Sequence, residues 1–171
     1  MKKLLILFVA VGSILVSGCQ GDDGRDGVTV EARTFELLNV NFGLNNNGEY
    51  TIYRTINPTI LDSDSILIYR LAGTIDSQTP IWQLIPRTLF LDEGELDYDY
   101  DFSLEDFTIY AGGTYNLAQT PQFLNNQTFR IVAIPGYFST SKGTNSPTVD
   151  LSDYNAVVKA YGLENQPIIQ L

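Results

Sequence analysis

The fold is decided by a stretch in which acidic and apolar side chains alternate without a break, Glu95-Leu96-Asp97-Tyr98-Asp99-Tyr100-Asp101-Phe102. A β-strand turns successive side chains to opposite faces, so a period of two is typical of a strand that is buried on one face. The four acidic side chains then form one solvent-facing column, with neighbours about 6.6 Å apart on the usual strand rise. The apolar and aromatic side chains form the opposite column, which we expect to face a core.

Turn signals and further apolar runs surround this strand on both sides. The segment Asn45-Asn46-Asn47-Gly48 is typical of a hairpin turn, because Asn and Gly tolerate positive φ. Run 66–71 is nearly all apolar, as in a central strand buried on both faces, and run 108–111 is expected to end at Gly112. About eight such strands predict a mainly β protein, either an antiparallel β-sandwich or a partly open barrel. The expected strands are 28–38, 49–56, 66–71, 81–84, 88–91, 95–102, 108–111 and 129–134, and the tail 167–171 is a candidate edge strand.

One helix is expected near the C-terminus, from Tyr154 to Tyr161. Asp150 or Ser152 is expected to cap its N-terminus, and Gly162 fits the position after its last turn. The side chains expected to pack on the sheet share one face of this helix and its start: Leu151, Tyr154, Val158 and Tyr161.

The first 18 residues predict a lipoprotein signal peptide. Lys2 and Lys3 form a basic start, and the apolar run 4–16 is too short to cross a membrane as a helix. The segment Val16-Ser17-Gly18-Cys19 resembles a lipobox, in which an aliphatic and two small residues precede an obligatory cysteine. The resemblance implies cleavage before Cys19 and acylation of its thiol, and two or more acyl chains give stable anchoring. Cys19 is the only cysteine of the chain, so no intramolecular disulfide competes for its thiol.

Residues 19–27 predict an acidic tether between the lipid and a single β-rich domain, residues 28–171. Glycines at 21, 24 and 27 have the collagen spacing, but the run is too short for a triple helix. Removal of the signal peptide also removes two lysines, so the formal net charge falls from −10 to −12. Such an acidic surface repels phosphate backbones, which excludes nucleic acid as a partner. We expect attachment to the membrane through the lipid.

The chain contains no histidine, which removes the usual general base and zinc ligand, so we expect no enzyme and no catalytic residue. Three interpretations of Asp97, Asp99 and Asp101 remain open. They are ligands of a calcium ion, the one cofactor considered, because carboxylate oxygens suit that ion. They contain the carboxylate pair of a glycoside hydrolase. Alternatively, they are the solvated face of an amphipathic strand.

Several exposed positions are candidates for ligand binding or modification. Aromatic side chains near predicted strand ends and loops either stack on sugars or fill and rim the core. The tripeptide Asp64-Ser65-Ile66 resembles an O-glycosylation sequon of secreted Bacteroidota proteins, which implies modification of Ser65. The aromatic candidates are Trp82, Tyr110, Tyr115 and Tyr137.

Taken together, the chain resembles a family of uncharacterised Bacteroidota lipoproteins that carry a short collagen-like Gly-x-y stub after the lipobox. The resemblance implies no particular activity, so no active site is carried over. Residues 20–23 resemble the acidic surface-export signal of that phylum, which implies an outer-membrane location with the domain facing outward. The matching features are Cys19, the glycines at 21, 24 and 27, and the segments 82–86, 129–132 and 150–155.

These observations favour a lipid-anchored cell-surface protein that is not an enzyme. Its domain either binds a protein or glycan partner or serves as a subunit of an envelope assembly. The alternatives are a carboxylate-dependent polysaccharide hydrolase and a purely structural surface protein.

Overall fold

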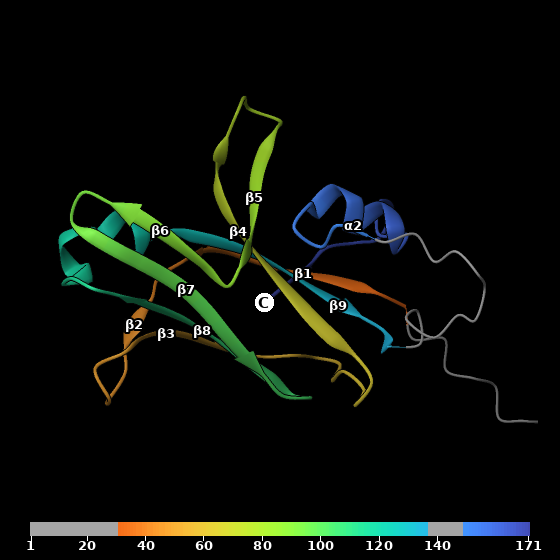
Figure 1. Cartoon of the computed structure of the whole chain (residues 1–171). Helices are drawn as coiled ribbons and strands as arrows, with labels where there is room; N and C mark the ends of the chain where they lie inside the picture. Colours follow the sequence, from red (N-terminus) through yellow and green to blue (C-terminus); the bar gives the residue numbers. More distant parts are fainter. Residues whose placement is uncertain (1–30, 137–148) are drawn as a thin grey trace, which may run out of the picture. The chain divides into compact units, whose positions relative to one another are not determined.

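Two five-stranded sheets pack face to face in the described part of the computed structural model, residues 31–136 and 149–171 (Figure 1). All neighbouring strands are antiparallel except β1 and β10, which are parallel. Sheet A has the order β10 (Ile169–Gln170), β1 (Arg33–Val40), β9 (Gln127–Ile134), β4 (Ser65–Thr74), β5 (Pro80–Ile85). Sheet B has the order β2 (Gly43–Leu44), β3 (Tyr50–Thr55), β8 (Asp106–Gly113), β7 (Gly94–Phe102), β6 (Arg87–Leu91).

This arrangement confirms the expected β-sandwich, and the described sheets do not close into a barrel. The residues from 31 to 171 form one compact unit. The expected signal peptide, Cys19 and the tether lie outside the described residues. Among the helices that are described, none has the length and apolar character to span a membrane.

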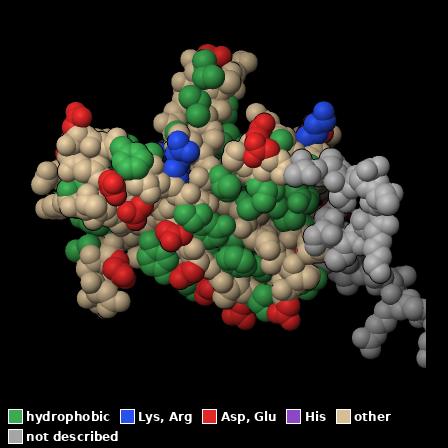
Figure 2. All heavy atoms as spheres, viewed as in Figure 1, with side chains coloured by type: hydrophobic (Ala, Val, Ile, Leu, Met, Phe, Trp, Pro, Cys, Tyr) green, Lys and Arg blue, Asp and Glu red, His purple; other side chains and the backbone are tan. Residues whose placement is uncertain are grey.

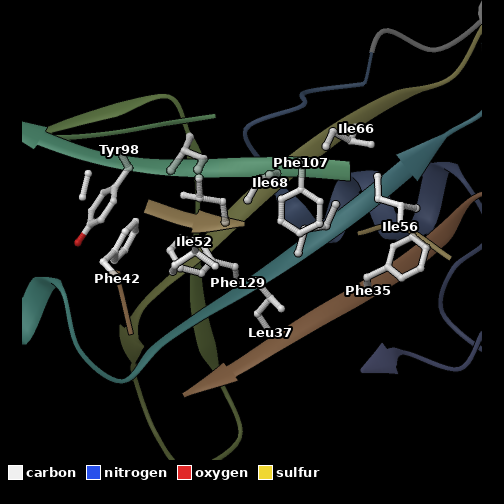
Figure 3. Packing of buried hydrophobic residues seen from close by; sticks show 14 of the residues in the cluster. Phe35, Leu37, Phe42, Ile52, Ile56, Ile66, Ile68, Tyr98, Phe107 and Phe129 are labelled. Carbon is white, nitrogen blue, oxygen red and sulfur yellow. The ribbon is translucent and has the colours of Figure 1, made fainter. Parts of the chain in front are cut away.

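The core lies between the two sheets and is built from their inward-facing columns (Figure 3). On β7, Leu96 and Tyr98 are fully buried while Asp97 and Asp99 are exposed, so the alternation read from the sequence is confirmed as far as Asp101. The expectation that Phe102 faces the core is wrong, because at the end of the strand its side chain is 43% exposed. Apolar side chains of this kind contribute about 1.5–3 kcal/mol each when fully buried. Figure 3 shows Phe35 of β1 beside Ile56, and Phe129 of β9 beside Ile52 of β3, all in the one cluster.

A second apolar cluster covers the outer face of sheet A. Tyr69 of β4 and Val132 of β9 are fully buried there, against Tyr154 and Val157 of helix α2 (Tyr154–Ala160). The Tyr69 hydroxyl donates to the carbonyl oxygen of Leu151 at 2.7 Å. Strand β4 is therefore buried on both faces, as its apolar sequence predicts.

Helix α2 begins at Tyr154, as expected, but its N-cap is neither of the two expected residues. Its N-cap is Asp153, whose Oδ1 accepts hydrogen bonds from the backbone N–H groups of Asn155 and Ala156. Asp150 instead closes the preceding turn by accepting from Ser152, so the expectation that either residue caps the helix is wrong. Leu151 precedes the helix and is 42% exposed, so Val157 rather than Leu151 packs beside Tyr154.

Strands β8, β2 and β10 and two 3₁₀ turns complete the comparison with the sequence expectation. Strand β8 does not end at Gly112 but continues through Gly113. The two-residue strand β2 was not expected, because two residues are too few to show an alternation. The C-terminal edge strand is present as β10. Two 3₁₀ turns, η1 (Leu117–Gln119) and η2 (Pro121–Phe123), connect β8 to β9.

We expect Asp153→Ala to lower the free energy of unfolding by about 1 kcal/mol, because two backbone N–H groups lose their acceptor. Ser152→Ala is the matched control, and we expect it to change stability by less than about 0.5 kcal/mol, since Ser152 is exposed. Urea unfolding monitored by circular dichroism measures both. Equal losses in the two variants would contradict the assignment of Asp153 as the cap.

Candidate functional site

The acidic column of β7 lies on the outer face of sheet B, where the neighbouring strands decide its surroundings. Asp97 lies opposite Gly112 of β8, and Asp99 lies opposite Tyr110. Because directly paired residues share a face of the sheet, the Asp99 carboxylate and the Tyr110 ring point to the same side. Figure 2 shows acidic side chains along the diagonal that β7 follows in Figure 1.

A hollow of about 530 Å³ opens on this face, and we call it the Asp97 hollow. Its rim carries the carboxylates of Glu49, Asp97 and Asp99 and the rings of Tyr110 and Tyr115. The lining of the hollow thus includes both carboxylate and tyrosine side chains. The other lining residues are Gly48, Tyr50, Ala111, Gly112, Gly113, Asn116 and Leu117.

Gly112 keeps the hollow open. A Cβ atom built at this position would lie 2.7 Å from Oδ2 of Asp97, closer than side chains tolerate. The adjacent Gly113 has a different role, because its Cβ would lie 2.5 Å from the backbone oxygen of Glu95 and 2.8 Å from Leu117 Cδ2. Gly112 therefore makes room for the Asp97 carboxylate on the outer face, whereas Gly113 permits close packing on the inner side.

The hairpin turn between β2 and β3 places Glu49 at the rim. Oδ1 of Asn45 accepts hydrogen bonds from the backbone N–H groups of Asn47 and Glu49, and Gly48 has a φ of 82°. The Asn45 side-chain amide also donates to Glu49 Oε2 at 2.9 Å. This confirms the turn read from Asn45-Asn46-Asn47-Gly48 and shows that the turn also orients a carboxylate.

The connection after β8 places Tyr115 on the other side of the hollow. Thr114 is bound to β7 at Glu95, since its N–H donates to the Glu95 carbonyl oxygen and its Oγ1 accepts from the Glu95 N–H, both at 2.9 Å. The hydroxyls of Tyr115 and Thr120 are hydrogen-bonded to each other. These contacts fix the Tyr115 ring, which is partly buried against the core.

Outside the hollow, tyrosine hydroxyls bind the carboxylates of the same face. Tyr110 donates to Asp101 Oδ2 at 2.8 Å, and Tyr53 donates to Asp106 Oδ2 at 3.0 Å. Each hydrogen bond to a carboxylate raises the pKa of the donating tyrosine, for Tyr110 through Asp101 and for Tyr53 through Asp106. Both hydroxyls therefore serve as donors to the protein's own carboxylates.

Of the three carboxylates singled out in the sequence, Asp97 and Asp99 line the hollow and Asp101 does not. Their shared face is the one expected from the alternation. In the described ranges, however, no three acidic side chains are arranged to hold a metal ion. A calcium site at these three residues therefore stays a prediction. The described residues do not place three carboxylates around one point, as a calcium ion requires.

The aromatic residues proposed from the sequence as sugar-binding candidates lie on different sheets in the structure. Tyr110 and Tyr115 line the hollow, whereas Trp82 lies on the outer face of sheet A, where the Arg130 guanidinium stacks 4.5 Å from its ring centroid. The Trp82 ring packs 5.5 Å from that of Tyr154, so it supports α2. Tyr137 lies outside the described residues.

Ser65 is exposed at the first position of β4, where a hydroxyl is accessible for modification. The preceding Asp64 is buried, and its Oδ2 accepts a hydrogen bond from the Leu61 N–H at 3.0 Å. Asp64, the aspartate of the expected sequon, thus stabilises the turn before β4.

Sequence reasoning missed Glu49 and Gly112 as parts of the site. Glu49 depends on the pairing of β3 with β8, in which Tyr50 lies opposite Ala111, and Gly112 depends on the pairing of β7 with β8, in which it lies opposite Asp97. Two features of the sequence pointed to these positions: the hairpin turn, which ends beside Glu49, and the glycines at 112 and 113. Neither feature indicates which strands are neighbours in the sheet.

Comparisons of the chain with protein-family models, with curated proteins and with solved structures found no match. The chemistry of the site therefore has to be inferred from its own residues.

The two neighbouring glycines test this geometry. We expect Gly113→Ala to lower the free energy of unfolding by about 1–3 kcal/mol, because its Cβ meets backbone and a core side chain. Gly112→Ala should change it by less than about 0.5 kcal/mol, since the exposed Asp97 side chain can rotate away. Urea unfolding of both variants provides the measurement, and a larger loss in Gly112→Ala would contradict the outward-facing hollow.

Proposed function

We propose that this chain is a lipid-anchored protein of the outer membrane whose outward-facing β-sandwich is a non-enzymatic binding module. Its ligand site is the Asp97 hollow on the outer face of sheet B. The observation that carries the proposal is that three acidic residues and two tyrosines line one hollow, on β7, on β8 and in the residues next to β3 and β8.

The anchor part of the proposal rests on the sequence alone. The lipobox-like segment 16–19, the basic start and the short apolar run form a complete lipoprotein signal. The glycine-rich acidic segment after Cys19 supplies a flexible spacer of a few residues. A tethered module gains encounter rate with surface-bound ligands because it is held near the membrane at high effective concentration.

The binding part is supported by the way the hollow is built. Its carboxylates stand on β7 and beside a hydrogen-bonded turn, so they are held by rigid elements, as a binding site requires. Neither the core nor α2 needs them, since Asp97 and Asp99 are exposed on the face opposite Leu96 and Tyr98. An acidic concave surface with no part in folding is best explained by an external ligand.

Cys19→Ala tests the anchor. In wild-type cells we expect the protein in the membrane fraction and labelled by a palmitate analogue, because acylation needs the thiol. The variant should be unlabelled and found in the soluble exported fraction with an unchanged circular dichroism spectrum. A variant that stays in the membrane fraction would show that the cleaved and lipidated form is not what holds the protein there.

Gly112→Val tests the hollow as the ligand site, because a larger side chain fills the space in front of Asp97. The control is Gly73→Val, since a Cβ at Gly73 meets no atom within 4 Å. We expect partners recovered from crosslinked cells, or ligands found on glycan arrays, to bind wild-type and the Gly73 variant but not the Gly112 variant. Recovery of the wild-type protein alone, together with blank arrays, would contradict a binding module.

A polysaccharide hydrolase remains the second candidate because Asp97 and Asp99 both line the hollow. Carboxylates two residues apart on a strand are separated by about 6.6 Å, which is within the range used by inverting glycosidases. Release of reducing ends from a bound glycan, lost in Asp97→Asn, would favour this candidate over a binding module.

A further inference from the structure

Arg70 of β4 is a buried cation without a carboxylate partner among the described residues. It lies opposite Phe129 of β9 on the inner face of sheet A and is 7% exposed. The one ion pair between described side chains, Arg130 with Glu36, lies on the outer face of the same sheet. Arginine is rarely buried unless something compensates its charge, so the groups around Arg70 have that role.

Neutral groups from three elements surround the Arg70 guanidinium. Its Nε donates a hydrogen bond to Oε1 of Gln127, at the start of β9, at 2.8 Å. Its central carbon lies over the rings of Tyr98 on β7 and Phe123 on η2, at 4.8 and 5.7 Å from the ring centroids. A cation is attracted to the face of an aromatic ring, most strongly where water is excluded. An amide oxygen and two rings thus stabilise the buried charge.

The amide that binds Arg70 also holds the connection between β8 and β9, residues 114–126, which we call the strap. Gln127 Nε2 donates to the carbonyl oxygens of Gln122 at 2.8 Å and Asn125 at 2.6 Å. Because an amide oxygen accepts and an amide nitrogen donates, the bond from Arg70 turns the nitrogen of Gln127 towards the strap. Arg70 therefore orients the side chain that fastens the end of the strap.

The strap belongs to neither described sheet, and most of its backbone hydrogen bonds are internal. Towards the sandwich, the Tyr98 hydroxyl donates to the Phe123 carbonyl oxygen at 2.7 Å, and the Leu124 carbonyl oxygen accepts from the Phe42 N–H at 2.9 Å. The strap can therefore open without breaking the ladder of either sheet. The donors of the internal bonds are the N–H groups of Gln119, Thr120, Phe123, Leu124 and Asn125.

We propose that Arg70 is the latch of this strap, and that the strap opens as one unit while both sheets stay folded. Leu117 and Leu124 are buried in the core when the strap is closed, which keeps the open state rare. Because Tyr115 and Leu117 line the Asp97 hollow, opening removes one wall of that hollow. Replacing a buried charge by a well-packed apolar side chain is often neutral or stabilising, so net stability alone does not explain an arginine here. The latch goes beyond the proposed function, because it operates whatever the hollow binds.

The test is hydrogen–deuterium exchange of the full-length protein in detergent, followed by mass spectrometry of peptides from the strap, from β7 and β9, and from α2. We expect Arg70→Met to speed exchange of the strap amides at least about tenfold, because a hydrogen bond from a charged group and two ring contacts are lost. Peptides of β7 and β9 should still exchange at least about tenfold more slowly than the strap, since the sheets open only with the whole domain. Equal rates in the strap and the strands would overturn the proposal.

The matched control is Arg130→Met, because Arg130 also stacks on aromatic rings but lies on the outer face of sheet A. We expect it to speed exchange of α2, whose Tyr154 hydroxyl it binds, and to change exchange of the strap less than about twofold. Equal acceleration of the strap by both variants would overturn the latch, and so would unchanged exchange of the strap in Arg70→Met.

Arg70→Lys is the second variant, and it carries the test if Arg70→Met does not fold. Lysine keeps the positive charge but lacks the planar guanidinium and its fixed Nε–H. We expect the strap to exchange at least about threefold faster than in the wild type, because the oriented hydrogen bond to Gln127 is lost. Wild-type protection of the strap in this variant would show that charge alone suffices, and it would overturn the guanidinium latch.

Discussion

The packing of α2 on the outer face of sheet A is the interaction on which the rest of the structure depends. Tyr69 and Val132 are fully buried on that face, and the Tyr69 ring meets that of Tyr154 edge-on, with centroids 5.2 Å apart. Without the helix, two central strands would expose a row of large apolar side chains, each worth about 1.5–3 kcal/mol when buried. The helix and the tail after it therefore lie over sheet A. The outer face of sheet B carries the exposed acidic column of β7 and also the side chain of Phe90, which is 80% exposed.

A single arginine connects the elements on this covered face. Arg130 of β9 pairs with Glu36 of β1, stacks on Trp82 of β5 and donates to the Tyr154 hydroxyl of α2 at 3.0 Å. Glu36 also accepts from the side-chain amide of Gln170 on β10, at 3.1 Å. A partly buried ion pair of this kind contributes little net stability but specifies geometry, because removing one partner leaves a charge without compensation. The arginine thus fixes where the helix and the last strand lie.

The sequence predicts well whatever depends on neighbours along the chain. The alternation in β7, the Asn-rich hairpin turn and the apolar β4 all concern residues within one element, and the structure confirms each of them. The cap of α2 was misplaced because three residues before the helix, Asp150, Ser152 and Asp153, all have side chains able to cap. The structure shows that Asp153 does so, because its backbone is extended, with φ −92° and ψ 103°, and its Oδ1 accepts hydrogen bonds from the N–H groups of Asn155 and Ala156.

What the sequence could not predict depends on pairing between strands. Gly112 looked like the end of a strand, because glycine weakens strands and often marks their ends. In the sheet it lies opposite Asp97, and the missing side chain gives that carboxylate its space. Trp82 looked like an exposed aromatic for sugar stacking, but the helix that covers it follows about 70 residues later. Cross-strand register and long-range packing are set by the whole fold and leave no local pattern.

The carboxylates of β7 on the outer face of sheet B are all exposed, but the surroundings of the acidic side chains on this face differ. Asp101 and Asp106 are bound by tyrosine hydroxyls from neighbouring strands, which hold these side chains in place without any ligand. Asp97 stands beside a glycine, at the edge of the Asp97 hollow, and accepts no hydrogen bond from the described residues. The face is therefore hydrogen-bonded within the described part of the chain at Asp101 and Asp106 and open at Asp97, whose space Gly112 provides.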